Sequence, residues 1–210
     1  MLEQALQVDS ATGADGVLLL GERHVILNDD GRVLDRRREV QRILTDHGLD
    51  AYGDPIVTFN SRSQDLSVEM ARTLRGDGEV VDVKDNALNV VTPKSVARAP
   101  HFADVQDMAI TLLGLEIGAA TDVKVEVVDR LPYREIFWGR EPLWDTRDIV
   151  EKEIVLRVPS ERDIVWFTQG VDLDPEVKKS AKTITYRFRI KDVEAINPHG
   201  LDEHRLPMLM

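Results

Sequence analysis

Apolar and polar residues alternate with a period of two along most of this chain. Valines alternate with charged residues over 122–127, and large apolar residues alternate with threonine and arginine over 184–190. Similar apolar sets occupy 108–112 and 154–158. Successive side chains of a strand point to opposite faces, so each set would share one face of a strand but scatter around a helix. The pattern therefore predicts half-buried β-strands.

Turn residues separate these segments. Asn28–Gly31 and Arg75–Gly78 each end in Asp-Gly or Gly-Asp-Gly, which suits turns that need a positive φ. Gly114 and Gly118 bracket a short bend before the valine-rich strand, and Pro159 closes the strand over 154–158. We expect reversals of the chain at each of these places.

About ten short strands separated by polar turns predict an all-β fold, an antiparallel β-sandwich with little helix. Only Leu2–Gln7 and Pro93–Ala97 are expected to hold a turn or two of helix. The segment 131–147 is rich in proline and aromatic residues and lacks the alternation, so it is either a cross-connection between sheets or a seam between two halves. The apolar end, Leu206–Met210, either docks on the domain or continues into a further segment.

Charge and composition narrow the classes of function. The net charge is −11, from 27 basic and 38 acidic residues, and such a surface repels phosphate backbones. The one basic run, Arg36–Arg38, would alternate between the two faces of a strand, so nucleic-acid binding is not expected. No apolar stretch approaches the roughly 18 residues of a membrane span, and no signal peptide is visible.

The chain has no cysteine, which removes thiol nucleophiles and thiolate ligands. It also has no Gly-x-Ser-x-Gly elbow and no phosphate-binding glycine loop. With 38 acidic residues, any pair of carboxylates is most simply solvated surface. We therefore predict that this chain is not itself an enzyme and needs no cofactor.

Two patterns resemble metal sites, and each has a simpler interpretation. The run from His199 through Asp202 and Glu203 to His204 has a spacing that matches no established zinc motif, and a solvated polar tail explains it better. The triplet Asp172, Asp174, Glu176 resembles the start of a calcium loop, but Val177 stands where such a loop needs glycine. The prediction is that no metal is bound, with a metal-dependent hydrolase using His199 and His204 as a rival hypothesis.

The best candidate for a binding surface is aromatic. Trp138 and Trp144 lie close in sequence to Phe137, Arg140 and Arg147, and tryptophan and arginine are the residues that most often anchor interfaces. Exposed tryptophans also stack on sugar rings. The competing interpretation is that these rings fill the core. We take Trp138, Trp144 and Arg140 as the predicted binding residues.

Several segments resemble one known family. Arg42–Gly48, continuing to Tyr52-Gly53-Asp54, resembles its early strand and turn, and Glu69–Val81 resembles its central hairpin. Leu113–Gly118 resembles its Pro-Gly-Leu-Glu-Pro-Gly turn, although Leu113 and Ile117 replace two prolines, and Val155–Pro159 resembles a later strand. In order and spacing these segments resemble domain of unknown function 3857, which precedes transglutaminase-like domains in bacterial proteins. The match covers about residues 14–200.

The resemblance implies one immunoglobulin-like β-sandwich over residues 14–200, with residues 201–210 starting a linker to a downstream domain. It implies a non-catalytic N-terminal accessory or interaction module of a transglutaminase-like, peptidase-related protein, in which the downstream domain carries the catalytic Cys-His-Asp set. It further implies an extracytoplasmic location, and protein or envelope polysaccharide as additional partners. The alternative is a stand-alone carbohydrate-binding sandwich that uses Trp138 and Trp144.

Overall fold

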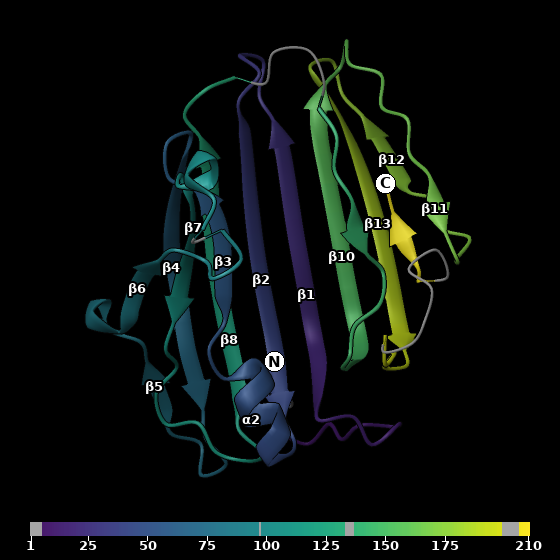
Figure 1. Cartoon of the computed structure of the whole chain (residues 1–210). Coiled ribbons are helices and arrows are strands. Elements are labelled where there is room, and N and C mark those ends of the chain that lie inside the picture. Colours follow the sequence, from purple (N-terminus) through teal and green to yellow (C-terminus); the bar gives the residue numbers. More distant parts are fainter. Residues whose placement is uncertain (1–5, 97, 133–136, 199–205) are drawn as a thin grey trace.

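The computed structural model describes residues 6–96, 98–132, 137–198 and 206–210. Most of the chain is β-strand, so the predicted all-β fold class is confirmed (Figure 1). The strands are β1 (Gly16–Leu27), β2 (Val33–Ile43), β3 (Ile56–Asn60), β4 (Gln64–Leu74), β5 (Val80–Asp82), β6 (Leu88–Val91), β7 (Val105–Ile110), β8 (Ala120–Asp129), β9 (Glu141–Pro142), β10 (Asp148–Pro159), β11 (Thr168–Gln169), β12 (Glu176–Lys179), β13 (Thr183–Val193) and β14 (Met208–Leu209).

One long sheet forms the centre of the molecule, with strand order β12-β13-β10-β1-β2-β8-β4-β5. All of its neighbouring strands are antiparallel except β1 and β10, which run parallel. The parallel pair arises because the connection after β8 crosses over β2 and β1, and β10 then runs in the same direction as β8 and β1. Residues 137–147 of this connection lie on one face of the long sheet and include β9.

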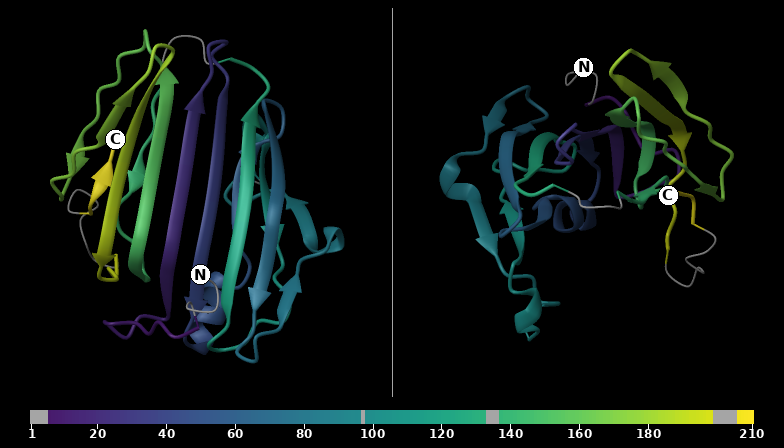
Figure 2. Two further views of the ribbon diagram at one scale, coloured as in Figure 1. Left: turned by 180° about the vertical axis from the view of Figure 1, so that it is seen from behind. Right: turned by 90° about the horizontal axis from the view of Figure 1, so that it is seen from above.

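Two small sheets lie against the same face of the long sheet, one on each flank (Figures 1 and 2). The sheet β3-β7-β6 covers the flank made by β4 and β8, and the sheet β11-β14-β9 covers the flank made by β10 and β13. We call the covered side the groove face, because β1 and β2 lie open between the two small sheets. In the described part of the chain, no other strand covers the opposite side, the back face (Figure 2, left).

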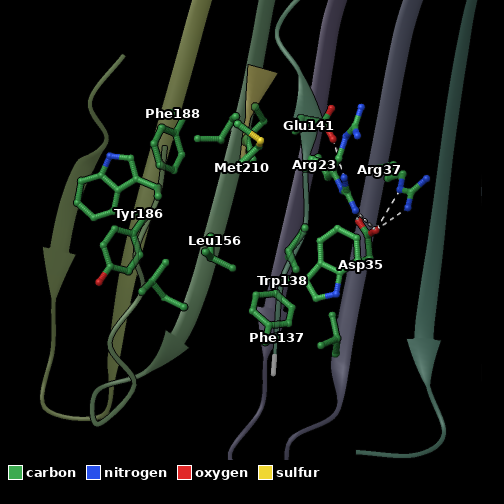
Figure 3. Close-up of a pocket in the computed structure, with 18 of the residues that line it drawn as sticks. Arg23, Asp35, Arg37, Phe137, Trp138, Glu141, Leu156, Tyr186, Phe188 and Met210 are labelled. Atoms are coloured by element: carbon green, nitrogen blue, oxygen red, sulfur yellow. Dashed lines mark hydrogen bonds and ion pairs between the residues drawn. The ribbon is translucent and has the colours of Figure 1, made fainter. Parts of the chain in front are cut away.

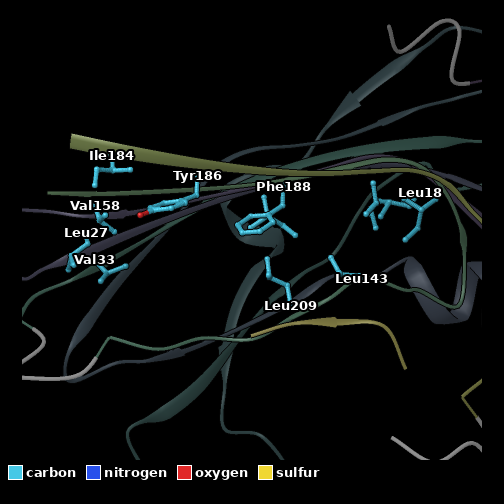
Figure 4. Close-up of a cluster of buried hydrophobic side chains, with 12 residues drawn as sticks. Leu18, Leu27, Val33, Leu143, Val158, Ile184, Tyr186, Phe188 and Leu209 are labelled. Atoms are coloured by element: carbon cyan, nitrogen blue, oxygen red, sulfur yellow. The ribbon is translucent and has the colours of Figure 1, made fainter. Parts of the chain in front are cut away.

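Each flank has its own hydrophobic core. Under β11-β14-β9, the core includes Leu143, Ile154, Tyr186, Phe188 and Leu209, all less than a tenth exposed (Figure 4). The second core lies under β3-β7-β6 and comprises Val57, Ala71, Ile110, Leu112, Val123, Val125 and Val127. The alternating apolar sets of the sequence therefore point toward the groove face, as the period of two predicts.

The back face carries the other half of each alternation, mostly as ion pairs across neighbouring strands. Arg36 contacts Glu126 at 2.6 Å, Lys124 contacts Glu69 at 2.5 Å, and Arg189 contacts Glu153 at 2.7 Å. Cross-strand pairs of opposite charge stabilise a sheet, although exposed pairs contribute only a few tenths of a kcal/mol each. The acidic excess of the sequence is thus partly neutralised in a solvated surface.

Asp122 on the same face is fully buried. Its carboxylate accepts hydrogen bonds from Arg38 Nε at 2.9 Å and from Arg72 Nη2 at 2.8 Å. Burial alone would raise the pKa of Asp122, but the two arginines lower it below the ordinary value. The carboxylate is therefore ionised and ties β8 to β2 and β4.

Asp148, at the start of β10, fixes two peripheral segments. Its carboxylate accepts from Ser10 Oγ at 2.5 Å, from Thr12 Oγ1 at 2.8 Å and from the Ala195 amide at 2.8 Å. Burial opposes the ionised form, but these hydrogen bonds lower the pKa of Asp148 to about 2. The N-terminal arm and the segment after β13 are thereby held at one end of the long sheet.

The predicted turns are confirmed, since Gly31, Gly78, Gly114 and Gly118 all have a positive φ. Of the two segments expected to hold a turn or two of helix, Leu2–Gln7 lies mostly outside the described residues and Pro93–Ala97 is described only in part. The chain has one α-helix in its described part, α2 (Asp46–Tyr52), where the resemblance led us to expect strand and turn. Thr45 caps it by accepting from the Gly48 amide at 3.0 Å, and 3₁₀ turns occur at Asp85–Ala87 (η1) and Pro100–Phe102 (η2). Residues 94–96 form only a turn.

The apolar end docks on the domain. Residues 206–210, which were predicted to start a linker, contain β14, the central strand of its small sheet, and Leu206, Met208 and Leu209 are buried. Residues 201–205 lie outside the described part. Among the described residues, no helix is long and apolar enough to cross a membrane.

Candidate binding groove

The two small sheets leave a groove along β1 and β2. It has two hollows, one of about 480 Å³ and one of about 240 Å³, and Arg37 lines both. β2 is decisive for this geometry, because the side chains that point to the groove face are polar in its middle: Asp35, Arg37, Glu39 and Gln41. A sheet face that is apolar on both flanks is therefore polar along its centre.

The floor of the larger hollow is a chain of ion pairs (Figure 3). Arg23 lies between two carboxylates, with Nη2 at 2.8 Å from Asp35 and Nη1 at 2.5 Å from Glu141. Arg37 Nη2 contacts the same Asp35 at 2.7 Å, and Lys152 Nζ contacts Glu141 at 2.7 Å. β1, β2, β9 and β10 each supply at least one of these groups, so the network joins the cross-connection to the long sheet.

This network keeps its carboxylates ionised. Burial would raise the pKa of Asp35, but hydrogen bonds from Arg37 and Arg23 hold it below the ordinary value. Burial would likewise raise the pKa of Glu141, but the charges of Lys152 and Arg23 lower it. Burial would lower the pKa of Arg23, but Asp35 and Glu141 have the larger effect and raise it. The floor therefore offers fixed charges and hydrogen-bonding groups to a ligand.

The smaller hollow has a similar construction around Arg147. Its guanidinium contacts Asp145 at 2.7 Å and Glu39 at 3.2 Å, donates to Gln41, and lies 5.2 Å from the centre of the Tyr52 ring. Burial disfavours this charge, and the two carboxylates raise the pKa of Arg147 in spite of it. Arg147 thus holds the end of the cross-connection against β2.

Apolar side chains form the wall of the larger hollow on the side of β11-β14-β9. Trp166 packs on Tyr186 and Phe188, with ring centres 5.6 and 6.3 Å apart. At the rim, Trp138 is 73% exposed and Val165 is 75% exposed. Large apolar side chains gathered at the mouth of a hollow are typical of an interaction site.

The predicted binding residues are separated by the structure. Trp138 and Arg140 both line the larger hollow, whereas Trp144 does not line it and is half-buried. The Nε1 atom of Trp144 is buried and has no hydrogen-bond partner within the described part of the chain. Of the predicted residues, Trp138 and Arg140 therefore lie together at the larger hollow, and Trp144 is not part of its lining.

The sequence did not single out Arg23, Asp35, Arg37 or Trp166 as members of a site. One signal was present: the run Arg36–Arg38 was predicted to alternate between faces, and it does. Arg36 and Arg38 pair with Glu126 and Asp122 on the back face, while Arg37 pairs with Asp35 in the groove.

Of the two candidate metal sites in the sequence, only the one at Asp172, Asp174 and Glu176 lies in the described part of the chain. Asp172 and Asp174 lie in an exposed loop before β12, and Glu176 starts that strand with its carboxylate on Lys178 at 3.0 Å. His199, Asp202, Glu203 and His204 lie outside the described residues. Within the described ranges there is no group of three or more histidine, aspartate or glutamate side chains placed to hold a metal ion.

Comparison with known proteins gives a family and a fold. The family model described as "Domain of Unknown Function with solved-structure structure (DUF3857)" matches residues 29–197. A crystal structure from Parabacteroides distasonis, described as that of a "putative protease", matches with a TM-score of 0.86 at 20% identity. The match covers 93% of this chain but only 39% of that protein, so this chain spans well under half its length. No curated protein matches.

Proposed function

The chain belongs to the DUF3857 family, and from this premise we propose that it is a non-catalytic accessory module. It positions or regulates a catalytic domain of the transglutaminase-like, peptidase-related class, carried by the same polypeptide. It uses the groove between its two small sheets for that contact.

The observation that carries this proposal is the state of the groove. Arg23, Asp35, Arg37 and Glu141 on its floor are bound to one another in ion pairs, and the pKa values of Asp35 and Glu141 are lowered rather than moved toward neutrality. General acid–base catalysis works best with a pKa near the working pH, so these groups suit binding better than proton transfer. The exposed Trp138 and Val165 at the rim suit contact with another protein surface.

The size of the similar protein from Parabacteroides distasonis agrees with this role. That protein is described as a "putative protease", and the fold shared with this chain makes up 39% of it. The larger remainder leaves room for a catalytic domain beside the shared fold. Carbohydrate binding receives no comparable support, because Trp138 is exposed but Trp144 lies outside the groove lining.

The test compares this chain with the complete protein encoded by its gene. Both are assayed for hydrolysis of casein and of a fluorogenic peptide, and for incorporation of a labelled amine into a glutamine-containing peptide. We expect turnover by the complete protein and none by residues 1–210 alone. Trp138→Ala in the complete protein should lower turnover, whereas Phe102→Ala, an exposed aromatic residue that does not line the groove, should not.

Two results would overturn the proposal. One is turnover by residues 1–210 alone that is lost in Asp35→Asn while the melting temperature stays unchanged. The other is a complete protein whose catalytic activity is the same with and without residues 1–210.

A further inference from the structure

The small sheet β11-β14-β9 continues past its central strand. β14 pairs with β11 through Thr168↔Leu209 and with β9 through Leu209↔Glu141. Met210 extends the first pairing by one step, since its amide donates to the Phe167 carbonyl and its carbonyl accepts from the Phe167 amide, both at 2.9 Å. The two segments that flank β14, which contain β11 and β9, therefore both extend beyond the end of β14 at Met210.

The register of these pairings defines what lies ahead of Met210. In this register, the first residue after Met210 would lie opposite Gly139 on one side and Trp166 on the other. The second residue after Met210 would lie opposite Trp138 and Val165. These last two are the most exposed of the large apolar side chains in the described part of the protein. We call the space between 138–140 and 165–166 the open slot.

Two further observations fit the open slot. A methyl group built on Gly139 would meet no atom within 4 Å, so the side of the Gly139 backbone to which that group points, out of the plane of the sheet, is open. Within the described residues, the backbone amides and carbonyls of Gly139 and Val165 make no hydrogen bond to another backbone group. An added extended segment would pair with both, because a strand in this register aligns with them alternately.

We propose that the open slot receives the polypeptide that follows Met210 in the complete protein, as an extension of β14 that covers Trp138 and Val165. This inference rests on the proposed function, which places this chain in a longer protein. The extension would bury the apolar rim of the groove and would fix the direction in which the next domain leaves the module. Apolar residues at the second position after Met210 would gain most, because they lie between the two exposed side chains.

The experiment uses residues 1–210 extended by the next dozen or so residues that the gene encodes. The control extension has the same length and consists of glycine and serine. Hydrogen–deuterium exchange is followed at the amides of Gly139 and Val165. Acrylamide quenching of tryptophan fluorescence reports mainly the exposure of Trp138, because Trp144 and Trp166 are half-buried. We expect the natural extension to slow exchange at both amides about tenfold or more and to reduce quenching, and the glycine-serine extension to do neither.

A second variant keeps the result independent of folding. In the naturally extended protein, Val165→Pro removes the amide that the added strand needs, and it should return exchange at Gly139 to the rate seen with glycine-serine. Unchanged exchange with the natural extension would overturn the inference, and so would a stop codon directly after Met210. If the amides are protected but catalytic turnover does not depend on residues 1–210, the open slot stands and the accessory function fails.

Discussion

Asp148 should control the acid stability of this protein. Replacing it by asparagine removes the charge that accepts hydrogen bonds from Ser10, Thr12 and Ala195, while keeping the size of the side chain. Its pKa is about 2 in the folded protein and 3.8 in its ordinary range. Because one pKa unit corresponds to about 1.4 kcal/mol, and solvent near the carboxylate weakens the effect, we expect Asp148→Asn to cost about 1–2 kcal/mol at pH 7.

The pH dependence follows from the direction of that shift. The folded state holds the ionised carboxylate, so as the pH falls below 3.8 the unfolded state takes up the proton first. The stabilisation is complete above about pH 5 and is lost as the pH falls toward about 2. The difference in free energy of unfolding between the natural chain and Asp148→Asn should therefore be constant from pH 5 to 8 and smaller at pH 3.

Urea unfolding followed by tryptophan fluorescence measures this difference at each pH. Asp172→Asn is the matched control, because Asp172 is an exposed carboxylate in a loop, and its effect should stay within about 0.5 kcal/mol. A cost for Asp148→Asn that is the same at pH 3 and pH 7 would refute the reasoning. It would show that shape, not charge, makes Asp148 important.

Three further predictions concern the core, the back face and the turns. Leu209→Ala should lower the free energy of unfolding by about 2–5 kcal/mol in urea titrations, whereas the exposed Met210→Ala should change it little; equal effects would contradict the placement of β14 in the core. Asp122→Asn removes a buried charge that accepts hydrogen bonds from two half-buried arginines, so we expect about 1.5–3 kcal/mol of destabilisation by thermal unfolding, and a loss below 1 kcal/mol would contradict the importance of these ion pairs. Gly114→Ala should lower the free energy of unfolding more than Gly78→Ala in the same assay. Both glycines have a positive φ, but only at Gly114 would the new methyl group lie 3.1 Å from another side chain. The reverse order would contradict that contact.

The strands were predictable because the two faces of the long sheet differ in chemistry along most strands. In β8, Val123, Val125 and Val127 point to the groove face, whereas Lys124 and Glu126 point to the back face. The alternation of the sequence therefore reflects the structure directly. The helix α2 was not predictable from propensity, since it spans only seven residues and contains Gly48. Its signal was the capping residue Thr45 rather than any periodicity.

The groove was hidden for a physical reason. In the middle of β2, Asp35 and Arg37 look like the solvent side of an amphipathic strand, yet they face the same side as the apolar cores. What makes them floor residues is that Asp35 pairs with Arg37 and with Arg23 on β1, which in turn pairs with Glu141 on β9. Such long-range neighbours cannot be read from local spacing. Trp138 was singled out because tryptophan and arginine are the residues that most often anchor interfaces, and this property can be read from residue type alone.

The parallel pairing of β1 with β10 sets an order for folding during synthesis. β1 and β2 are joined by a short turn and can pair as soon as they leave the ribosome, but β1 meets its other neighbour only when residues 148–159 have been made. Leu209 completes the core beside Tyr186 and Phe188 later still. Until then one edge of β1 and one apolar flank face the solvent, and contacts of such long sequence separation form slowly. We therefore expect nascent chains that stop between β2 and β14 to bind chaperones and to be cleaved readily by proteases.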